Sequence, residues 1–287
     1  MISRLLAMAA LAALVVVPAG ASAEAGPGRI VTLAPHLAEI VFAAGGGDRL
    51  VGVTEYTDYP PAAAELPRIG DAFRVDMERL SVLDPDLVLA WEDGTPAALV
   101  ARLRERGYPV VSVRTRSLED IAVAIERVGA RLGTVSQSDR AAEAFRSELA
   151  AVVAGHDAGR PLRVFYQVAG QPLYTVNGGH FISELIRLCG GRNIFEDLGD
   201  LAPVVTVESV LARDPELILA TGSDVASLDR WRRWGSLSAV RADNLRLLPA
   251  DTLARPSPRV VRGAADLCGA IEASRHRLPP HAARRSE

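Results

Sequence analysis

Two histidine–glutamate pairs have the spacing of metal ligands on one face of a helix. His36 and Glu39 are three positions apart, and His180 and Glu184 are four apart. A transition-metal site needs three or four convergent ligands, and the whole chain contains only 5 histidines. We therefore interpret His36 as a polar group at the start of a helix that follows a strand, where ligands meet open α/β sheets. The sequence predicts neither a resident metal nor a bound cofactor.

The sequence lacks the common motifs of phosphate-binding and hydrolytic enzymes. It has no glycine-rich loop ending in Gly-Lys-Ser or Gly-Lys-Thr, and no Gly-x-Ser-x-Gly nucleophile elbow. The glycines at 45–47 follow a predicted helix, so they cap that helix instead of cradling a phosphate. The net charge of −3 comes without a dense basic face, which argues against nucleic acid as a partner.

The chain has few aromatic residues, and several of them follow predicted strands. The carboxyl ends of parallel strands border the ligand crevice of an open sheet, so aromatic side chains there can contact a ligand. Ordinary loop packing is the alternative for any one of them. The candidates are Tyr56, Phe73, Trp91 and Tyr174.

One segment of the sequence occurs twice. Val-Asp-Met-Glu at 75–78 leads into Asp-Pro-Asp at 84–86, and Val-Thr-Val-Glu at 205–208 leads into Asp-Pro-Glu at 214–216. The offset is constant, since 208 − 78 and 214 − 84 are both 130. The repeat predicts two lobes of similar build, each with one glutamate at the start of an equivalent helix. A cleft between two lobes is a natural binding site.

Apolar strands alternate with amphipathic helices on both sides of one long helical stretch at 138–154. This order is typical of parallel sheets covered by helices. The first series comprises strands at 29–33, 50–53, 87–90 and 110–113 and helices at 35–44, 96–106 and 118–132. The second comprises strands at 162–167, 217–220 and 245–248 and helices at 181–189, 207–213 and 258–274. We expect two α/β lobes, at 28–135 and 160–277, an interlobe helix at 136–158 and a disordered tail at 278–287.

The start of the chain predicts export. Residues 1–23 combine a cationic start, an apolar run and an Ala-x-Ala cleavage signal, which together are typical of a signal peptide. Two cysteines follow, Cys189 and Cys268, both in the second half. An even count in an exported protein favours a disulfide, here within the second lobe. Two buried free thiols are the alternative.

Five sequence motifs resemble those of the periplasmic cobalamin (vitamin B12) binding proteins, which belong to the helical-backbone class of substrate-binding proteins. The resemblance extends from about residue 29 to about residue 273. It implies two Rossmann-like lobes bridged by a single long α-helix, with the ligand cleft between them. The motifs are Ala34-Pro-His-Leu-Ala-Glu39, Glu55-Tyr-Thr-Asp-Tyr-Pro-Pro61, Pro85-Asp-Leu-Val-Leu-Ala-Trp91, Leu188-Cys-Gly-Gly-Arg-Asn-Ile-Phe195 and Ser257-Pro-Arg259.

The resemblance also implies roles for individual residues. In this family an acidic residue on each lobe docks onto the membrane permease, and these positions fall on Glu78 and Glu208. A helix-dipole role for the two glutamates is the alternative. The Cys189–Cys268 pair matches the family disulfide. The ligand set that we expect at the cleft is His36, Tyr56, Phe73, Trp91, Tyr174, His180, Asp251 and Arg255.

Two aromatic positions of the family are changed in this chain. Ala72, with Phe73 next to it, and Ala202 stand where the best-known members have tryptophan. Burying an aromatic side chain contributes a few kcal/mol, so these changes bear on affinity and on the identity of the ligand.

The sequence thus predicts a monomeric periplasmic binding protein, without enzymatic activity, that delivers cobalamin or a related tetrapyrrole to an ABC transporter permease. A haem or ferric-siderophore carrier of the same fold is the nearest alternative, and a haem carrier would use His36, His180 or a tyrosine as axial ligand. A periplasmic metalloenzyme using His36, Glu39 and His180 is a more distant one.

Overall fold

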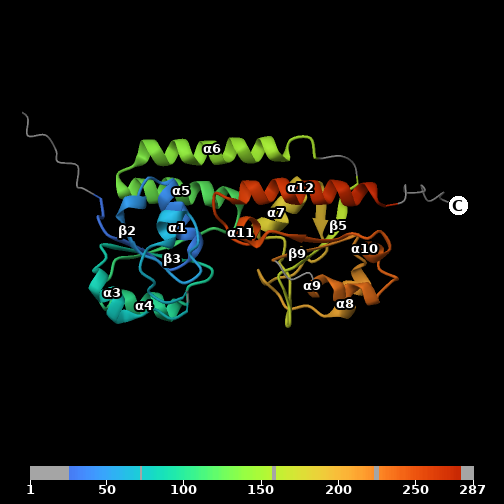
Figure 1. Cartoon of the computed structure of the whole chain (residues 1–287), viewed down its shortest axis with the longest axis horizontal. Coiled ribbons are helices and arrows are strands. Elements are labelled where there is room, and N and C mark those ends of the chain that lie inside the picture. The colour runs from blue at the N-terminus through green and yellow to red at the C-terminus, as the bar shows by residue number, and fades with distance from the viewer. Residues whose placement is uncertain (1–25, 72, 157–159, 223–225, 279–287) are drawn as a thin grey trace, which may run out of the picture.

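The computed structural model describes residues 26–71, 73–156, 160–222 and 226–278. The predicted signal peptide, Ala72 and residues 279–287 of the predicted tail lie outside the described residues. The elements form two α/β lobes side by side, with one long helix running above both (Figure 1). The predicted fold class is confirmed.

The first lobe is built on a parallel sheet with strand order β2-β1-β3-β4. Its central strands are buried on both faces, as their unbroken apolar sequence requires. The strands are β1 (Ile30–Thr32), β2 (Leu50–Gly52), β3 (Leu87–Trp91) and β4 (Val110–Val113). The helices are α1 (Pro35–Ala43), α2 (Pro61–Ala64), α3 (Met77–Leu83), α4 (Ala97–Glu105) and α5 (Leu118–Leu132), with a 3-10 turn at Gly47–Arg49.

The second lobe repeats this arrangement with a parallel sheet of order β10-β9-β5-β8. Read from the other edge, β8, β5, β9 and β10 take the places of β2, β1, β3 and β4. The strands are β5 (Leu162–Gln167), β8 (Gly191–Asn193), β9 (Leu217–Thr221) and β10 (Leu245–Leu248), beside a small hairpin of β6 (Ala169–Gly170) and β7 (Leu173–Tyr174). The helices are α7 (Phe181–Leu188), α8 (Val207–Arg213), α9 (Ala226–Asp229), α10 (Ser238–Arg241), α11 (Ala250–Leu253) and α12 (Val260–His276), with a 3-10 turn at Arg230–Arg233.

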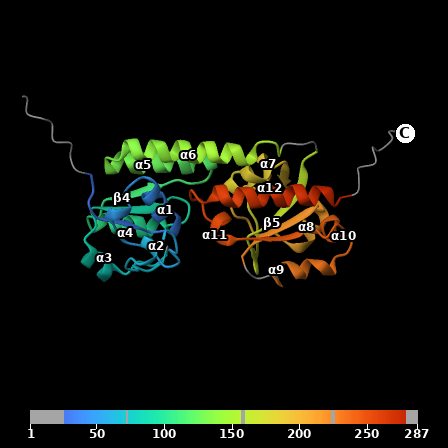
Figure 2. The ribbon, with the colours of Figure 1, turned by 45° about the horizontal axis from the view of Figure 1, so that its top comes forward.

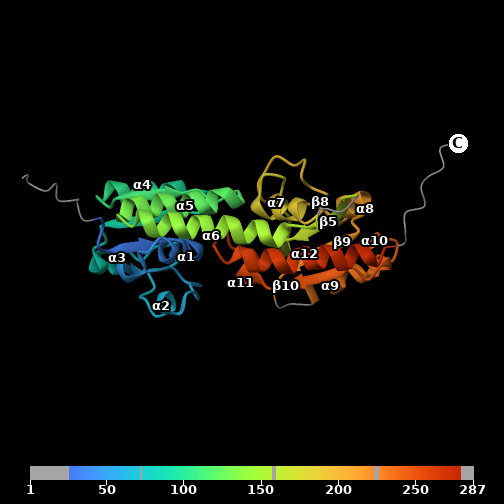
Figure 3. The same ribbon diagram turned by 90° about the horizontal axis from the view of Figure 1, so that it is seen from above.

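Helix α6 (Val135–Val153) joins the two lobes. Seen from above, it lies along α5 of the first lobe and reaches α12 of the second (Figures 2 and 3). Its buried residues include Ala142 and Phe145, which belong to a hydrophobic cluster shared by both lobes. One rigid helix packed on both lobes restricts their relative movement.

The repeated sequence segment forms the same structure in both lobes. Helices α3 and α8 each have seven residues, and each ends at an aspartate in the left-handed conformation, Asp84 at φ 39° and Asp214 at φ 41°. Aspartate tolerates this conformation better than most residues, and the proline that follows prevents the helix from continuing. Both helices lie on the side of the molecule away from α6 (Figure 1).

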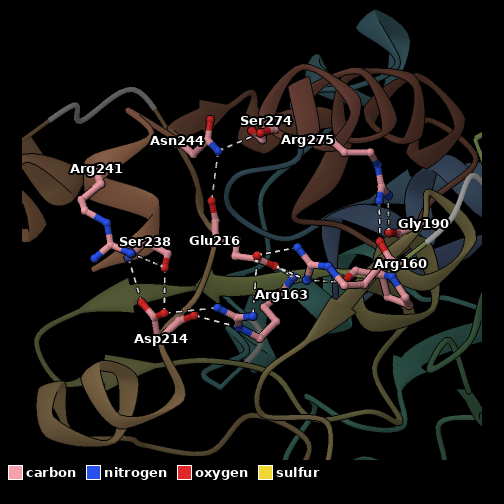
Figure 4. A network of polar contacts seen from close by, with 11 residues as sticks. Arg160, Arg163, Gly190, Asp214, Glu216, Ser238, Arg241, Asn244, Ser274 and Arg275 are labelled. Atoms are coloured by element: carbon pink, nitrogen blue, oxygen red, sulfur yellow. Dashed lines mark hydrogen bonds and ion pairs between the residues drawn. The ribbon is translucent and has the colours of Figure 1, made fainter. Parts of the chain in front are cut away.

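The last acidic residue of each repeat accepts hydrogen bonds from the backbone near the start of a neighbouring strand. Asp86 accepts hydrogen bonds from the backbone nitrogens of Gly28 and Arg29, both at 2.9 Å. Its counterpart Glu216 accepts one from the Arg163 nitrogen at 3.0 Å and two from the Arg160 guanidinium (Figure 4). This half of the repeat is therefore a structural device of the fold.

A disulfide joins Cys189, at the end of α7, to Cys268 in α12, which confirms the predicted pairing. Some elements differ from the prediction. Helix α6 begins three residues before the helical stretch predicted at 138–154 and one residue before the interlobe segment predicted at 136–158. Strand β8 and the β6–β7 hairpin were not predicted because they are short and have no apolar run. Within the described residues, none of the helices combines the length and apolar character needed to span a membrane.

Candidate functional site

Side chains of the two lobes meet along a line that we call the interlobe seam. From the first lobe it includes the start of α1, the segment 54–59, the end of β3 and the start of α5. From the second lobe it includes the start of α7 and the segment 251–259, which comprises most of α11 and the residues that lead to α12. Each of these segments comes directly before or after a regular element, so the sheets fix its position.

An ion pair between Arg259 and Glu39 lies at the centre of the seam. The Arg259 Nε and Nη2 donate to the two carboxylate oxygens of Glu39 at 2.9 and 2.7 Å. The side chains are only 10% and 2% exposed. Burial works to lower the pKa of Arg259, but its hydrogen bonds to Glu39 and the charges of Glu39, Asp58 and Asp251 raise it above its ordinary value. The guanidinium also lies 4.4 Å from the ring centre of Tyr59.

Arg255 makes a second set of contacts across the seam. Its Nη1 donates to Asp58 Oδ1 at 2.5 Å, and its Nη2 donates to the carbonyl oxygen of Tyr56 at 3.0 Å. Asp58 Oδ1 is also 3.5 Å from Arg259. Partial burial works to raise the pKa of Asp58, but its hydrogen bond to Arg255 and the charges of Arg255 and Arg259 hold it below its ordinary value.

A further contact closes the other side of the seam. The carboxylate of Glu184 in α7 accepts a hydrogen bond at 2.9 Å from the backbone nitrogen of Leu118, the first residue of α5. Both glutamates that the sequence spaced as metal ligands, Glu39 and Glu184, are thus engaged in contacts between the lobes. Among the described residues, no group of three or more His, Cys, Asp or Glu side chains is arranged to hold a metal ion.

His36 and Trp91 form an aromatic pair on the first lobe. Their rings meet edge to face with centroids 5.0 Å apart. The Trp91 ring lies so close to Gly94 that a Cβ there would be 1.9 Å from its Cε3 atom, so any other residue at this position would displace the ring. His36 is 3% exposed. Its Nε2 and the Trp91 Nε1 are both buried without a hydrogen-bond partner among the described residues, so each can still bond to a water or a ligand.

His180 occupies the N-cap of α7, on the opposite side of the seam. Its Nδ1 accepts a hydrogen bond from the Ile182 nitrogen at 3.2 Å, and its ring stacks on Phe181. Burial lowers the pKa of His180 to about 4, against the opposing charge of Asp93 in the first lobe. The imidazole is therefore neutral at physiological pH, and its proton is on Nε2.

The pKa of His36 leads to a testable pH dependence. Burial and then the charge of Arg255 lower the pKa of His36 from 6.5 to about 3. Below pH 6.5 the unfolded chain binds a proton here that the folded chain does not bind, so stability falls as the pH drops from 6.5 towards 3. We expect His36 to account for a loss of about 2 kcal/mol in unfolding free energy between pH 7 and pH 5.

Urea unfolding of the wild type and of His36→Phe at the two pH values measures this contribution. The variant should lose less stability on acidification than the wild type, by the same ~2 kcal/mol. His276→Gln, an exposed position on α12, is the matched control and should keep the wild-type pH dependence. Parallel pH profiles for wild type and His36→Phe would contradict a neutral, buried His36.

The structure brings most of the predicted ligand set to the seam, but not all of it. His36, Tyr56, Trp91, His180, Asp251 and Arg255 lie there. Asp251 is exposed at the start of α11, with its carboxylate 3.9 Å from Arg259. Two residues have no described side-chain contact with this group: Phe73, which is 70% exposed, and Tyr174, which ends β7.

The seam contains residues that the sequence did not single out as a set. Glu39, Asp58 and Arg259 form a cross-lobe charge cluster, yet Glu39 and Arg259 are 220 positions apart. One signal indicates that Glu39 needs a partner, although not which one: Glu39 lies in the apolar helix sequence Leu-Ala-Glu-Ile-Val, and a carboxylate buried there needs a cationic partner.

A cavity of about 330 Å³ opens beside this cluster, between the lobes and below α6. It is lined by Glu39, Phe42, Tyr59, Glu148, Arg259 and Arg262, among others. A larger cavity of about 450 Å³ lies within the first lobe, between β4 and α5. The cavity shared by the lobes is thus small, and the aromatic rings of the seam are outside it apart from Tyr59.

The sequence of residues 30–252 matches the family model described as periplasmic binding protein. This match covers most of the chain. The chain belongs to the periplasmic binding protein family. A relative in Vibrio cholerae, a vitamin B12-binding protein, is 39% identical over 241 residues, which cover 84% of this chain and 87% of the relative.

Solved structures of family members have the same fold. The crystal structure of the periplasmic vitamin B12-binding protein BtuF of Vibrio cholerae superposes with a TM-score of 0.80 at 37% identity, covering 87% of this chain and 98% of that one. The periplasmic heme-binding protein RhuT from Roseiflexus sp. superposes with a TM-score of 0.76 at 26% identity, covering 87% and 99%. The fold is therefore shared by carriers named for different tetrapyrroles.

Proposed function

We propose that this protein is a periplasmic carrier that captures cobalamin or a closely related corrinoid and delivers it to an ABC transporter permease in the inner membrane. The observation that carries the proposal is the 39% identity to a vitamin B12-binding protein over 84% of the chain. In this proposal residues 1–23 direct export, the mature protein acts as a monomer in the periplasm, and the protein has no enzymatic activity.

The ligand site of this proposal is the seam. The rings of Tyr56 and Trp91 contact the macrocycle, joined by Phe73 from its loop and Tyr174 from the end of β7. Asp251 and Arg255 lie at the polar rim, and His36 and His180 face the ligand from opposite lobes. The lone pair of a neutral imidazole and the unpaired Nε1 of Trp91 suit a ligand whose edge carries amides, which can donate to one and accept from the other.

Haem is the second candidate ligand, and one observation favours it. His36 Nε2 is buried and without a partner among the described residues, and its lowered pKa keeps the imidazole deprotonated. A neutral imidazole is a common axial ligand of haem iron. The 26% identity to a heme-binding carrier is well below the 39% identity to a vitamin B12-binding protein, so we favour the corrinoid.

Titration of the mature protein, beginning at Glu24, with cobalamin and with haem separates the two ligands. We expect saturable heat with cobalamin at one ligand per chain by calorimetry. Tight haem binding with a shifted Soret band, and no heat with cobalamin, would overturn the proposal in favour of haem.

Single aromatic deletions then locate the site. Removal of a ring that packs on the ligand loses a few kcal/mol of apolar burial, so Tyr56→Ala and Trp91→Ala should each weaken cobalamin binding by ~10- to 100-fold. Tyr108→Ala is the matched control, since Tyr108 precedes β4 and so lies at the opposite end of the sheet from Trp91. Unchanged affinity in both seam variants would place the ligand elsewhere.

A further inference from the structure

Arg255 is bound to the segment that carries Tyr56, and both of its contacts cross from one lobe to the other. Its Nη1 and Nη2 donate to Asp58 Oδ1 and to the Tyr56 carbonyl oxygen at 2.5 and 3.0 Å. The Arg255 side chain is 22% exposed. Two of its nitrogens are therefore already used by the protein itself.

Tyr56 has an unusual backbone conformation. Its φ of 64° lies in the left-handed region, which aromatic residues rarely adopt. The Thr57 nitrogen donates to the Thr54 carbonyl at 3.4 Å, so Tyr56 is the third residue of a turn, a position that favours glycine when φ is positive. Tyr56 is 80% exposed. A conformation of this kind persists where the surroundings hold it.

Contacts from both lobes hold this turn. On its own lobe, Thr57 Oγ1 donates to the Thr54 carbonyl and Arg68 Nη2 donates to the Thr57 carbonyl, each at 2.8 Å. These contacts fix the residues on either side of Tyr56. The carbonyl of Tyr56 itself is held by Arg255, from the other lobe.

We propose that Arg255 is a positioning residue, which holds the Tyr56 ring in its ligand-facing orientation when the lobes are closed. The inference rests on the proposed function, because it takes Tyr56 as a ligand contact. When the lobes separate, Arg255 leaves the 56–58 segment, and the turn is held by its own lobe alone. The orientation of the Tyr56 ring is thus linked to lobe closure through two hydrogen bonds.

A double-mutant cycle on cobalamin affinity tests this link. Arg255→Gln should weaken binding by ~10-fold when residue 56 is tyrosine but by less than ~2-fold in a Tyr56→Ala background, because residues that act through one another are not additive. Equal losses in both backgrounds would overturn the proposal and assign Arg255 a ligand contact of its own.

Asp58→Ala separates the two roles in a second way. A positioning role requires Asp58 to hold Arg255 in place, so this variant should also weaken binding by ~10-fold. If Arg255 instead contacts the ligand directly, loss of Asp58 frees its guanidinium and leaves the affinity unchanged or higher. Arg140→Gln, an exposed arginine on α6, is the matched control and should bind cobalamin like the wild type.

A measurement without ligand keeps the inference separate from the proposed function. The chain has 5 tyrosines, so 3-fluorotyrosine labelling gives few fluorine resonances, and Tyr56→Phe identifies that of Tyr56. We expect this resonance to move and narrow in both Arg255→Gln and Asp58→Ala as the ring gains freedom. An unchanged resonance would overturn the positioning role. If the wild type binds no cobalamin, the proposed function fails, and this measurement still decides the role of Arg255.

Discussion

Replacement of both Glu78 and Glu208 by glutamine is expected to abolish cobalamin uptake by cells while leaving the affinity for cobalamin unchanged. Both side chains are exposed, and each lies in the first turn of a repeated helix. A charge-assisted hydrogen bond contributes about 1.5–3 kcal/mol, so two lost contacts would weaken docking to a permease by more than ~100-fold.

The helix-dipole alternative predicts a much smaller effect. The N-cap residues of α3 and α8, Asp76 and Thr206, already accept hydrogen bonds from backbone nitrogens in the first turns of these helices. An exposed glutamate in the first turn then adds about 0.3–1 kcal/mol of stability each. If this is their whole role, the double variant unfolds slightly earlier and transports normally.

Uptake of labelled cobalamin in cells that carry only the variant measures the docking role, and calorimetry on the purified protein measures binding. Asp139→Asn with Glu143→Gln is the matched control, because both residues are exposed on α6, a helix on the opposite side of the molecule from α3 and α8. Normal uptake by the Glu78→Gln, Glu208→Gln protein would contradict the docking role.

Glu39→Gln is expected to destabilise the protein by about 3–5 kcal/mol, because it leaves the buried guanidinium of Arg259 without its charge partner. Arg259→Met should have a similar cost for the reciprocal reason. The double variant Glu39→Leu with Arg259→Met should recover most of the loss, since a packed apolar pair removes both charges from the interior. Denaturant unfolding of the wild type, the two single variants and the double variant measures these differences in unfolding free energy.

An exposed ion pair supplies the control for this prediction. Arg192 and Glu196 are joined at 2.7 Å, but their side chains are 65% and 41% exposed. Arg192→Ala should therefore cost less than about 1 kcal/mol. If Glu39→Gln lowers the unfolding free energy no more than Arg192→Ala does, then water reaches the Glu39–Arg259 pair. In that case the pair contributes little to the stability of the interface between the lobes.

Local signals predicted most of the regular elements. Helix α5 has the bounds expected from the sequence because both ends carry strong signals: Ser117 and Asp120 form a capping box, and Gly133 adopts the left-handed conformation. Strand β8 was missed because Gly-Arg-Asn has no strand pattern of its own, and its place depends on pairing with β5. The two-residue strands β6 and β7 are likewise too short for any periodicity.

The site was predicted only in part, because its contacts join residues far apart in the sequence. The aromatic side chains at strand ends could be found, since strand order and chain direction follow from the βα pattern. The partners of Glu39 and Glu184 could not, since Arg259 and Leu118 come beside them only when two lobes pack together. The spacing of Glu39 and Glu184 from nearby histidines is that of metal ligands, but in the folded protein both carboxylates make contacts between the lobes.

The Cys189–Cys268 disulfide lies entirely in the second lobe, yet its influence reaches the seam. It pins α12 to the end of α7, and Arg259 is the N-cap residue of α12. The start of α7 carries His180 and Glu184, so the two helices that the bond joins supply the second lobe's side of the seam. That side is therefore braced by a bond that lies at the far end of α7 and in the middle of α12. A chain still in a reducing compartment lacks this constraint, so the chemistry of the compartment helps to determine where the protein becomes competent to bind.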